Sequence, residues 1–372
     1  MADFAALAVP GVQALRPYEP GKPVETLERE LGIREAVKLA SNENPLGPSP
    51  RAVDAIRNGL ETLHIYPDGN GHALKQALAE RHGVSPEQVT LGNGSNEVLE
   101  LIARTWLAPG RNAVYAQHAF AVYPLVVQAV SAEGRTVKAL GPDSNQPYGH
   151  DLEAMAAQVD ADTRVVFVAN PNNPTGTWLR ADALERFIAG VPDETLVVVD
   201  EAYAEYVEDH DYPDTTQWLQ RFPNLLVTRT FSKIHGLAGL RLGYSVSSAM
   251  VAELLNRARQ PFNVNALAQL AGLAALGDSA HVAQSVRVNR EGLLQVGSGL
   301  RERGLDFIPS VGNFLTFDVR QAPGPVYDRL LRHGIIVRPV ANYGLPTHLR
   351  VTIGTATENQ RFLQALDAVL SS

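Results

Sequence analysis

Short β-branched runs separated by helix-like segments most restrict the fold of this 372-residue chain. The runs at residues 164–168 and 195–199 are apolar at every position after the first (Arg164 and Thr195), which is typical of strands buried on both faces. Between them, Leu184, Phe187 and Ile188 have the spacing of an amphipathic helix. Strand, helix and strand in this order predict an α/β fold with a mostly parallel sheet covered by helices.

Polar residues stand within three positions of the ends of three predicted strands. Asn170 follows the first strand, Asp200 follows the second, and Ser232-Lys233 follows a third at residues 225–230. The separations, 30 residues from Asn170 to Asp200 and 33 from Asp200 to Lys233, are each about one strand-plus-helix unit. Because ligands bind beyond the carboxyl ends of parallel strands, we expect an amide, a carboxylate and an amine at one edge of the sheet.

The run from Ser232-Lys233 to Arg241 predicts lysine chemistry next to an anion. An anion held by Ser232 and Arg241 would place a carbonyl group within reach of the Lys233 amine. A phosphorylated aldehyde that forms a Schiff base with lysine has this form. The ordinary alternative for the pair alone is an exposed turn.

A glycine-rich turn at residues 92–97 precedes a predicted helix at 98–107. Free backbone N–H groups at a helix N-terminus favour phosphate binding, although a simple N-cap by Ser95 or Asn96 is the alternative. Glu97 stands where a dinucleotide fingerprint requires its third glycine, and no Gly-Lys-Ser/Thr sequence indicates a triphosphate site.

The sequence Asp200-Glu201-Ala202-Tyr203 places a carboxylate at a strand end and a phenol three residues later. A buried carboxylate needs a cation or strong donors, and a protonated pyridine nitrogen is one such partner. Tyr203 and Asn170 could then both contact a phenolate oxygen on the same ring. A helix N-cap is the simpler role for Asp200.

Two arginines and one phenylalanine complete the candidate residues. Arg338 follows a predicted strand at 335–337, and Arg350 precedes or enters the apolar part, 351–353, of another predicted at 349–353. Arginines beside apolar strands favour an anion site, with surface ion pairs as the alternative. Phe120 could stack on a cofactor or pack in the core.

Composition excludes several classes of function. The net charge of −8 and the absence of a Lys/Arg block argue against nucleic acid or an anionic membrane as partner. The absence of cysteine excludes disulfides, cysteine nucleophiles and thiolate metal sites. No apolar stretch approaches the roughly 20 residues that span a bilayer, and the N-terminus lacks the pattern of a secretory signal. We therefore expect a cytoplasmic protein.

The chain is expected to divide into an N-terminal arm (1–35), a large domain (36–265) and a smaller C-terminal α/β domain (266–372). Frequent prolines between Pro10 and Pro50 predict that the N-terminal segment is extended. A helical region is predicted at 265–303, further strands at 313–318, 335–337 and 349–353, and a terminal helix at 358–370.

Three motifs together resemble the fold-type-I pyridoxal-5′-phosphate (PLP) aminotransferases. They are Asn-Pro-x-Asn-Pro-Thr-Gly at 170–176, Asp-Glu-Ala-Tyr at 200–203, and Ser-Lys followed by Gly-Leu-Ala-Gly-x-Arg-x-Gly at 232–243. The resemblance implies a large domain with a mostly parallel seven-stranded sheet, and a smaller α/β domain. Residues 41–47, 66–68 and 92–97 are most similar to stretches of the histidinol-phosphate aminotransferase family.

That family resemblance implies a PLP-dependent, ping-pong transfer of an amino group between histidinol phosphate and 2-oxoglutarate, in a homodimer with shared active sites. Lys233 would carry PLP as a Schiff base and then shuttle a proton, Asp200 would pair with the pyridinium nitrogen, and Asn170 and Tyr203 would hold the ring oxygen. The other implied contacts are Gly94, Ser95, Asn96, Ser232, Arg241 and the partner subunit's Tyr66 for the cofactor phosphate, Phe120 for stacking where relatives often have tyrosine, and Tyr18, Asn44, Arg338 and Arg350 for the substrate.

Three alternatives remain at this stage. An aromatic amino-acid aminotransferase differs only in its side-chain pocket, which sequence does not reveal. A phosphothreonine-type decarboxylase could use the same scaffold. A PLP-sensing regulator would need a DNA-binding module, and no basic helix-turn-helix segment precedes the aminotransferase-like region.

Overall fold

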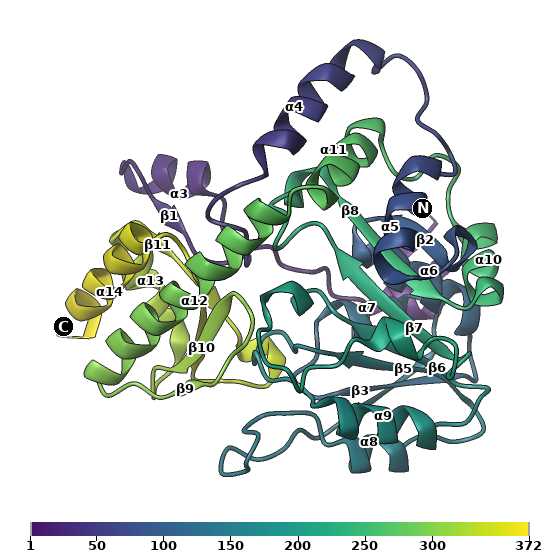
Figure 1. Ribbon diagram of the computed structural model, residues 1–372. Helices are drawn as coiled ribbons and strands as arrows, with labels where there is room; N and C mark the ends of the chain where they lie inside the picture. Colours follow the sequence, from purple (N-terminus) through teal and green to yellow (C-terminus); the bar gives the residue numbers. More distant parts are fainter. Residues whose placement is uncertain (1, 371–372) are drawn as a thin grey trace.

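The computed structural model, which describes residues 2–370, is built around a seven-stranded sheet (Figure 1). In spatial order the strands are β2 (Val89–Asn93), β8 (Leu242–Ser247), β7 (Leu225–Thr230), β6 (Leu196–Asp200), β5 (Thr163–Ala169), β3 (Asn112–Ala116) and β4 (Glu133–Val137). Neighbouring strands pair in parallel except at β8, which runs antiparallel to both β2 and β7. The predicted α/β class with a mostly parallel sheet is confirmed.

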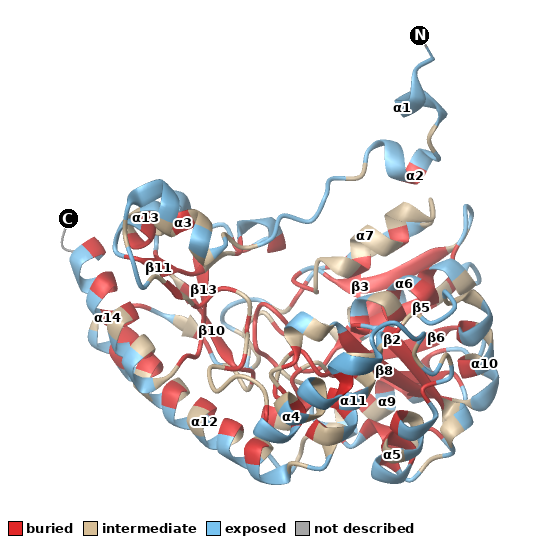
Figure 2. Cartoon of the chain, turned by 90° about the horizontal axis from the view of Figure 1, so that it is seen from above, coloured by how far each residue is buried: buried red, intermediate tan, exposed pale blue. Residues whose placement is uncertain are grey.

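Helices cover both faces of this sheet, and the strands between them are buried (Figure 2). Along β5, Val166 and Val168 pack into one hydrophobic cluster, while Val165 and Phe167 pack into the cluster on the opposite face. The first cluster contains residues of α5 (His72–His82), α8 (Leu152–Ala157), α9 (Ala181–Gly190) and α11 (Ala266–Leu276). The second contains residues of α6 (Ser95–Trp106), α7 (Val122–Ala129) and α10 (Ala249–Ala258).

A second, four-stranded sheet with its own core forms the C-terminal part. Its strands in spatial order are β12 (Arg338–Pro339), β13 (His348–Thr352), β10 (Phe314–Asp318) and β9 (Phe307–Ile308). Its core includes residues of α12 (Ser279–Glu302), α13 (Pro323–Arg332), β11 (Ile335–Ile336) and α14 (Ala356–Leu370).

The helical region predicted at 265–303 is two helices, α11 and α12, because Asp278 caps the start of the second by accepting a hydrogen bond from the His281 N–H. Within residues 2–370, no helix, the 24-residue α12 included, combines the length and apolar character needed to cross a membrane.

The N-terminal segment is only partly extended. It contains α1 (Phe4–Leu7), α2 (Pro10–Gln13), α3 (Val24–Leu31), β1 (Val37–Lys38) and α4 (Pro50–Gly59). The expectation of an extended arm is therefore wrong for 24–31, where α3 follows Pro23 and Leu27 is buried. Pro10 and Pro50 occupy first positions of helices, where a missing N–H costs nothing.

One predicted domain boundary needs correction. β1 pairs with β11, and Val37 and Leu39 pack in the C-terminal core, although both lie within the predicted large domain 36–265. The other boundaries stay predictions, and their end positions Met1, Ser371 and Ser372 lie outside the described residues.

Candidate active site

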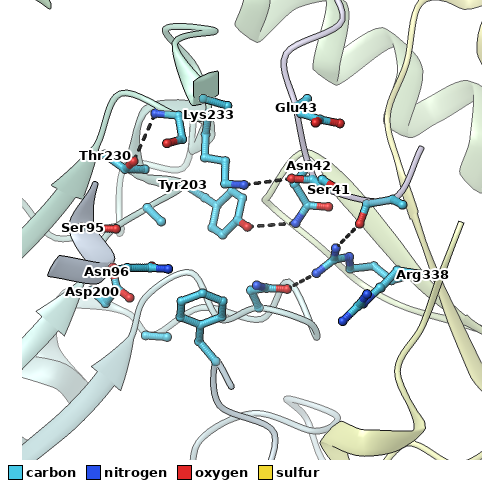
Figure 3. A pocket seen from close by; sticks show the side chains of 18 of the residues that line it. Ser41, Asn42, Glu43, Ser95, Asn96, Asp200, Tyr203, Thr230, Lys233 and Arg338 are labelled. Atoms are coloured by element: carbon cyan, nitrogen blue, oxygen red, sulfur yellow. Dashed lines mark hydrogen bonds between the residues drawn. The ribbon is translucent and has the colours of Figure 1, made fainter. Parts of the chain in front are cut away.

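A cavity of about 250 Å³ lies beyond the carboxyl ends of β5, β6 and β7 (Figure 3). Residues from the N-terminal segment, including Ser41 to Glu43, line one part of it, and Arg338 and Arg350 of the small sheet line another. Of the predicted site residues, the cavity lining includes Tyr18, Ser95, Asn96, Phe120, Asp200, Tyr203, Ser232, Lys233, Arg241, Arg338 and Arg350.

Lys233 projects into this cavity from the turn after β7 (Figure 3). Its Nζ donates a hydrogen bond of 2.9 Å to the Ser41 carbonyl. Burial, reinforced by the positive charges of Arg350 and Arg241, lowers the pKa of Lys233 to about 8. Part of the Lys233 amine is therefore neutral near pH 7. The neutral amine is the form that acts as a nucleophile or a base.

Asp200, the last residue of β6, is 6% exposed and faces the same cavity. Its two oxygens accept hydrogen bonds from the Tyr123 hydroxyl (2.8 Å) and the Thr228 hydroxyl (2.9 Å). Burial raises the pKa of Asp200, while both hydrogen bonds oppose that rise. Because Asp200 lies in no ion pair with another part of the described chain, its negative charge suits a cationic ligand.

Polar groups that fit a phosphate gather where α6 begins. Ser95 and Asn96 open the helix, and Arg241 Nη1 lies 3.4 Å from the Ser232 hydroxyl oxygen. Gly94 has a φ of +80°, and a Cβ there would lie 2.6 Å from Arg241 Nη2. Glycine thus lets the backbone approach the guanidinium, which leaves backbone donors and a cation side by side.

The assignment of Asn170 to the ring oxygen is wrong in this structure. The Asn170 side chain is fully buried and makes two hydrogen bonds with the backbone of Leu179. It donates to the Leu179 carbonyl (3.4 Å) and accepts from the Leu179 N–H (2.9 Å). Asn173, from the same loop, lines the cavity instead and accepts a hydrogen bond from Arg350. Both asparagines precede a proline, so the motif alone does not tell which amide faces inward.

Asn44 is also misassigned as a substrate ligand. Its amide donates to the Ile234 carbonyl (2.7 Å) and to the Ser285 hydroxyl (2.9 Å), away from the cavity lining. Asn42, two positions earlier, lines the cavity and donates a 2.9 Å hydrogen bond to the Tyr203 hydroxyl (Figure 3). Sequence reasoning assigned no role to Asn42 and Asn173, which line the cavity, or to Tyr123 and Thr228, which hydrogen-bond Asp200.

Arg350 is 5% exposed, and within residues 2–370 it takes part in no ion pair. It donates to Asn173 and to the Ala40 carbonyl (2.6 Å), and its Nε is buried without a partner. A buried cation with an unused donor indicates that an anion binds here.

Arg338 lies directly across the sheet from Arg350, in the antiparallel pairing of β12 and β13. Its guanidinium lies 5.4 Å from the Tyr18 ring centre and donates to the Glu19 carbonyl (2.6 Å). Like charges facing each other across a sheet are unfavourable unless an anion joins them.

The family model described as aminotransferase class I and II matches residues 34–366. The chain belongs to this family. Histidinol-phosphate aminotransferase 2 of Pseudomonas aeruginosa is 62% identical to this aminotransferase, in an alignment that covers 100% of both chains. Histidinol-phosphate aminotransferase 2 of Methylococcus capsulatus is 56% identical and covers 99% of both.

Solved structures agree with this membership. Histidinol-phosphate aminotransferase from Sinorhizobium meliloti, solved in complex with pyridoxal-5′-phosphate, has 30% identity, a TM-score of 0.87 and 97% coverage of each chain. The resemblance inferred from the three sequence motifs is thereby confirmed.

Tyr66 of this aminotransferase lies outside the cavity lining of its own chain. It is 80% exposed and stacks on Phe262, with ring centres 4.8 Å apart. Any contact of Tyr66 with a cofactor would therefore need a second subunit.

Proposed function

We propose that this aminotransferase uses PLP to exchange an amino group between histidinol phosphate and 2-oxoglutarate in a ping-pong reaction. The observation that carries the proposal is the meeting of Lys233, Asp200 and the buried Arg350 in one cavity. The names of the 56–62% identical relatives support the choice of substrate.

The residues present fit the cofactor that the family implies. Asp200 would hold the ring nitrogen, and Tyr203 and Asn173 would hold the ring oxygen. Gly94, Ser95, Asn96, Ser232 and Arg241 would hold the phosphate, and Phe120 would lie against the ring. When bound, PLP supplies an electron sink that makes the proton on the amine-bearing carbon of the substrate removable.

Lys233 is the residue proposed to move that proton. Its Nζ is held by the Ser41 carbonyl and has a pKa of about 8, so the amine can both accept and return a proton near neutral pH. The nearby Tyr203 ring, 5.8 Å from Nζ, helps to limit the directions in which the amine can move.

Arg350 and Arg338 are proposed to bind the anionic end of both substrates. The phosphate of histidinol phosphate and the side-chain carboxylate of 2-oxoglutarate are both oxyanions suited to a guanidinium. Tyr18, 47% exposed at the cavity mouth, would cover the bound substrate.

A direct comparison of substrates tests this proposal. At fixed 2-oxoglutarate, we expect kcat/KM for histidinol phosphate to exceed that for phenylalanine by about 100-fold or more, since phenylalanine brings no phosphate to Arg350. The relatives do not favour the aromatic alternative. A higher kcat/KM for phenylalanine would restore it.

Absorption spectra test the cofactor separately. After mixing with PLP and removal of the unbound PLP, which is itself yellow, wild-type protein should show a Schiff-base absorption band that Lys233→Ala lacks, while Lys38→Ala, which removes another amine near the site, should keep the band. An identical spectrum for wild type and Lys233→Ala would contradict the role of Lys233.

A homodimer with shared sites is part of the proposal. Helices α4 and α11 lie side by side (Figure 1). We call the exposed apolar side chains on α11 and in the segments that follow α4 and precede α11 the α4–α11 patch. They are Leu60, Leu63, Ile65, Tyr66, Phe262, Leu270 and Leu273. Such a patch is typical of a subunit interface, and Tyr66 within it would reach the partner's cofactor phosphate. A cytoplasmic location stays a sequence-based prediction.

A further inference from the structure

The Asp200 carboxylate is held by one hydroxyl group on each oxygen. The Tyr123 hydroxyl donates to Oδ2 at 2.8 Å, and the Thr228 hydroxyl donates to Oδ1 at 2.9 Å. Both donors are fully buried. Two donors from different elements fix the plane of the carboxylate and leave its remaining acceptor sites for a ligand.

Tyr123 is held rigidly in this role. It lies in the first turn of α7, and its ring stacks on Phe167 of β5 with centres 4.8 Å apart and planes 8° apart. The ring of Phe120 packs perpendicular to it, with ring centres 6.0 Å apart. Because apolar rings surround Tyr123, its hydroxyl has no other hydrogen-bond partner among residues 2–370 than Asp200.

Thr228 approaches from the opposite side. It lies on β7 directly beside Asp200 in the parallel pairing of β6 and β7. The next carboxylate, Glu201, does not compete for this hydroxyl, because it pairs with Arg229 at 2.6 Å and accepts from Thr215.

We propose that Tyr123 and Thr228 are positioning residues that keep Asp200 ionised and aligned toward the protonated ring nitrogen of the cofactor. This inference rests on the proposed function. Hydrogen bonds to a carboxylate favour its charged form and counteract burial. Without either donor, Asp200 would take up a proton at higher pH and would turn more freely.

The other titratable groups near Asp200 do not obscure this effect. They are Lys233 and the phenols of Tyr203 and Tyr212. Burial raises the pKa of both phenols, so they stay neutral through the acid range, and the pKa of Lys233 is about 8. The phosphate of PLP, with a second pKa of about 6, titrates alike in wild type and variants, so a difference between them below about pH 7 reports on Asp200.

The test measures the dissociation constant of PLP against pH, from about pH 5 to pH 8, by fluorescence titration of the cofactor-free protein. For Tyr123→Phe and Thr228→Val we expect about tenfold weaker PLP binding at pH 6. The loss of affinity on acidification, which we call the acid limb of the curve, should begin at a higher pH than in the wild type. Tyr244→Phe is the matched control: it removes a buried phenol that contacts His82 at 2.9 Å, outside the cavity, and should leave the curve unchanged.

The same substitution made in a second variant distinguishes a positioning role of Tyr123 from a role in packing alone. In Asp200→Asn protein, Tyr123→Phe should weaken PLP binding much less than in the wild type, because the carboxylate it supports is gone. Equal effects in both backgrounds, or an acid limb that stays in place in both variants, would overturn the inference. Wild-type protein that binds no PLP would instead contradict the proposed function itself.

Discussion

At the scale of single residues, Arg350 has the clearest chemical role. Arg350→Lys keeps the charge but loses the planar fork that contacts Asn173 and Ala40 and still offers Nε. We expect kcat/KM to fall about 100-fold for histidinol phosphate and for 2-oxoglutarate alike, because one group serves both anions. Steady-state kinetics with each substrate varied in turn checks this.

The matched control for Arg350 is Arg257→Lys, which alters an exposed arginine on α10 and should change neither value. A loss confined to one of the two substrates would show that the anions bind at different places.

Lys233 should also affect stability against pH in the cofactor-free protein. Its pKa is about 8 when folded and 10.5 as the ordinary value, so between these pH values the unfolded chain binds more protons and stability rises with pH. Below pH 8 the cost of the buried ammonium is fully present. Lys233→Met should therefore raise the melting temperature most at pH 7 and least near pH 10.

Melting curves of wild type and Lys233→Met at several pH values measure this difference. The comparison between the two proteins cancels the tyrosines, which titrate in both. A stabilisation by Lys233→Met that stays constant with pH would disagree with the lowered pKa of Lys233.

Sequence reasoning placed residues well where the backbone direction decides their position. Asp200 and Lys233 lie at the cavity because each ends, or closely follows, a buried strand whose carboxyl end points there. It failed for Asn170 and Asn44, whose amides lie near the cavity but turn to the backbone of Leu179 and Ile234. The direction of an amide depends on its tertiary partners, which sequence does not show.

At the scale of elements, the contact between β8 and α6 positions the groups that are proposed to bind the cofactor phosphate. Gly243 of β8 lies so close to this turn that an added Cβ would be 2.2 Å from the Ser95 nitrogen and 2.6 Å from the Gly94 carbonyl carbon. Gly243→Ala must therefore shift the backbone, at a cost of about 1–3 kcal/mol, and should weaken PLP binding as well as lower the melting temperature.

Gly190 provides the comparison for Gly243, because a Cβ at this exposed end of α9 meets nothing within 4 Å. Gly190→Ala should leave PLP affinity unchanged and the melting temperature equal or slightly higher. If Gly243→Ala bound PLP as tightly as Gly190→Ala does, the close packing of β8 against α6 would not matter for the cofactor.

Elements with strong local patterns were predictable, and reversals of direction were not. The strand at 225–230 matches β7, and the terminal helix differs from α14 by two residues at its start. The antiparallel direction of β8 was not predicted, because it depends on β8 inserting between β2 and β7. β1 was not predicted either, because it is only two residues long and pairs with a strand about 300 positions away.

At the scale of the whole molecule, the α4–α11 patch predicts the oligomeric state. Leu63→Asp places a charge on a 56% exposed side chain in the patch, so we expect the proposed dimer to dissociate and PLP to bind more weakly, since the proposed contact of Tyr66 from the second subunit would be lost. Leu294→Asp changes a 66% exposed leucine on α12, outside the patch, and should stay dimeric. Sedimentation velocity of both variants distinguishes these results, and a dimeric Leu63→Asp would place the interface elsewhere.

The pairing of β1 with β11 has a consequence for how the protein is made. During translation, Val37 and Lys38 leave the ribosome long before Ile335 and Ile336, the residues they pair with. Ser41, whose carbonyl accepts a hydrogen bond from the Lys233 amine, lies three positions after this strand. A nascent chain that has not yet reached residue 336 thus lacks the strand that pairs with β1, and it also lacks Arg338 and Arg350 of the cavity lining, so the site can be completed only when synthesis is nearly finished.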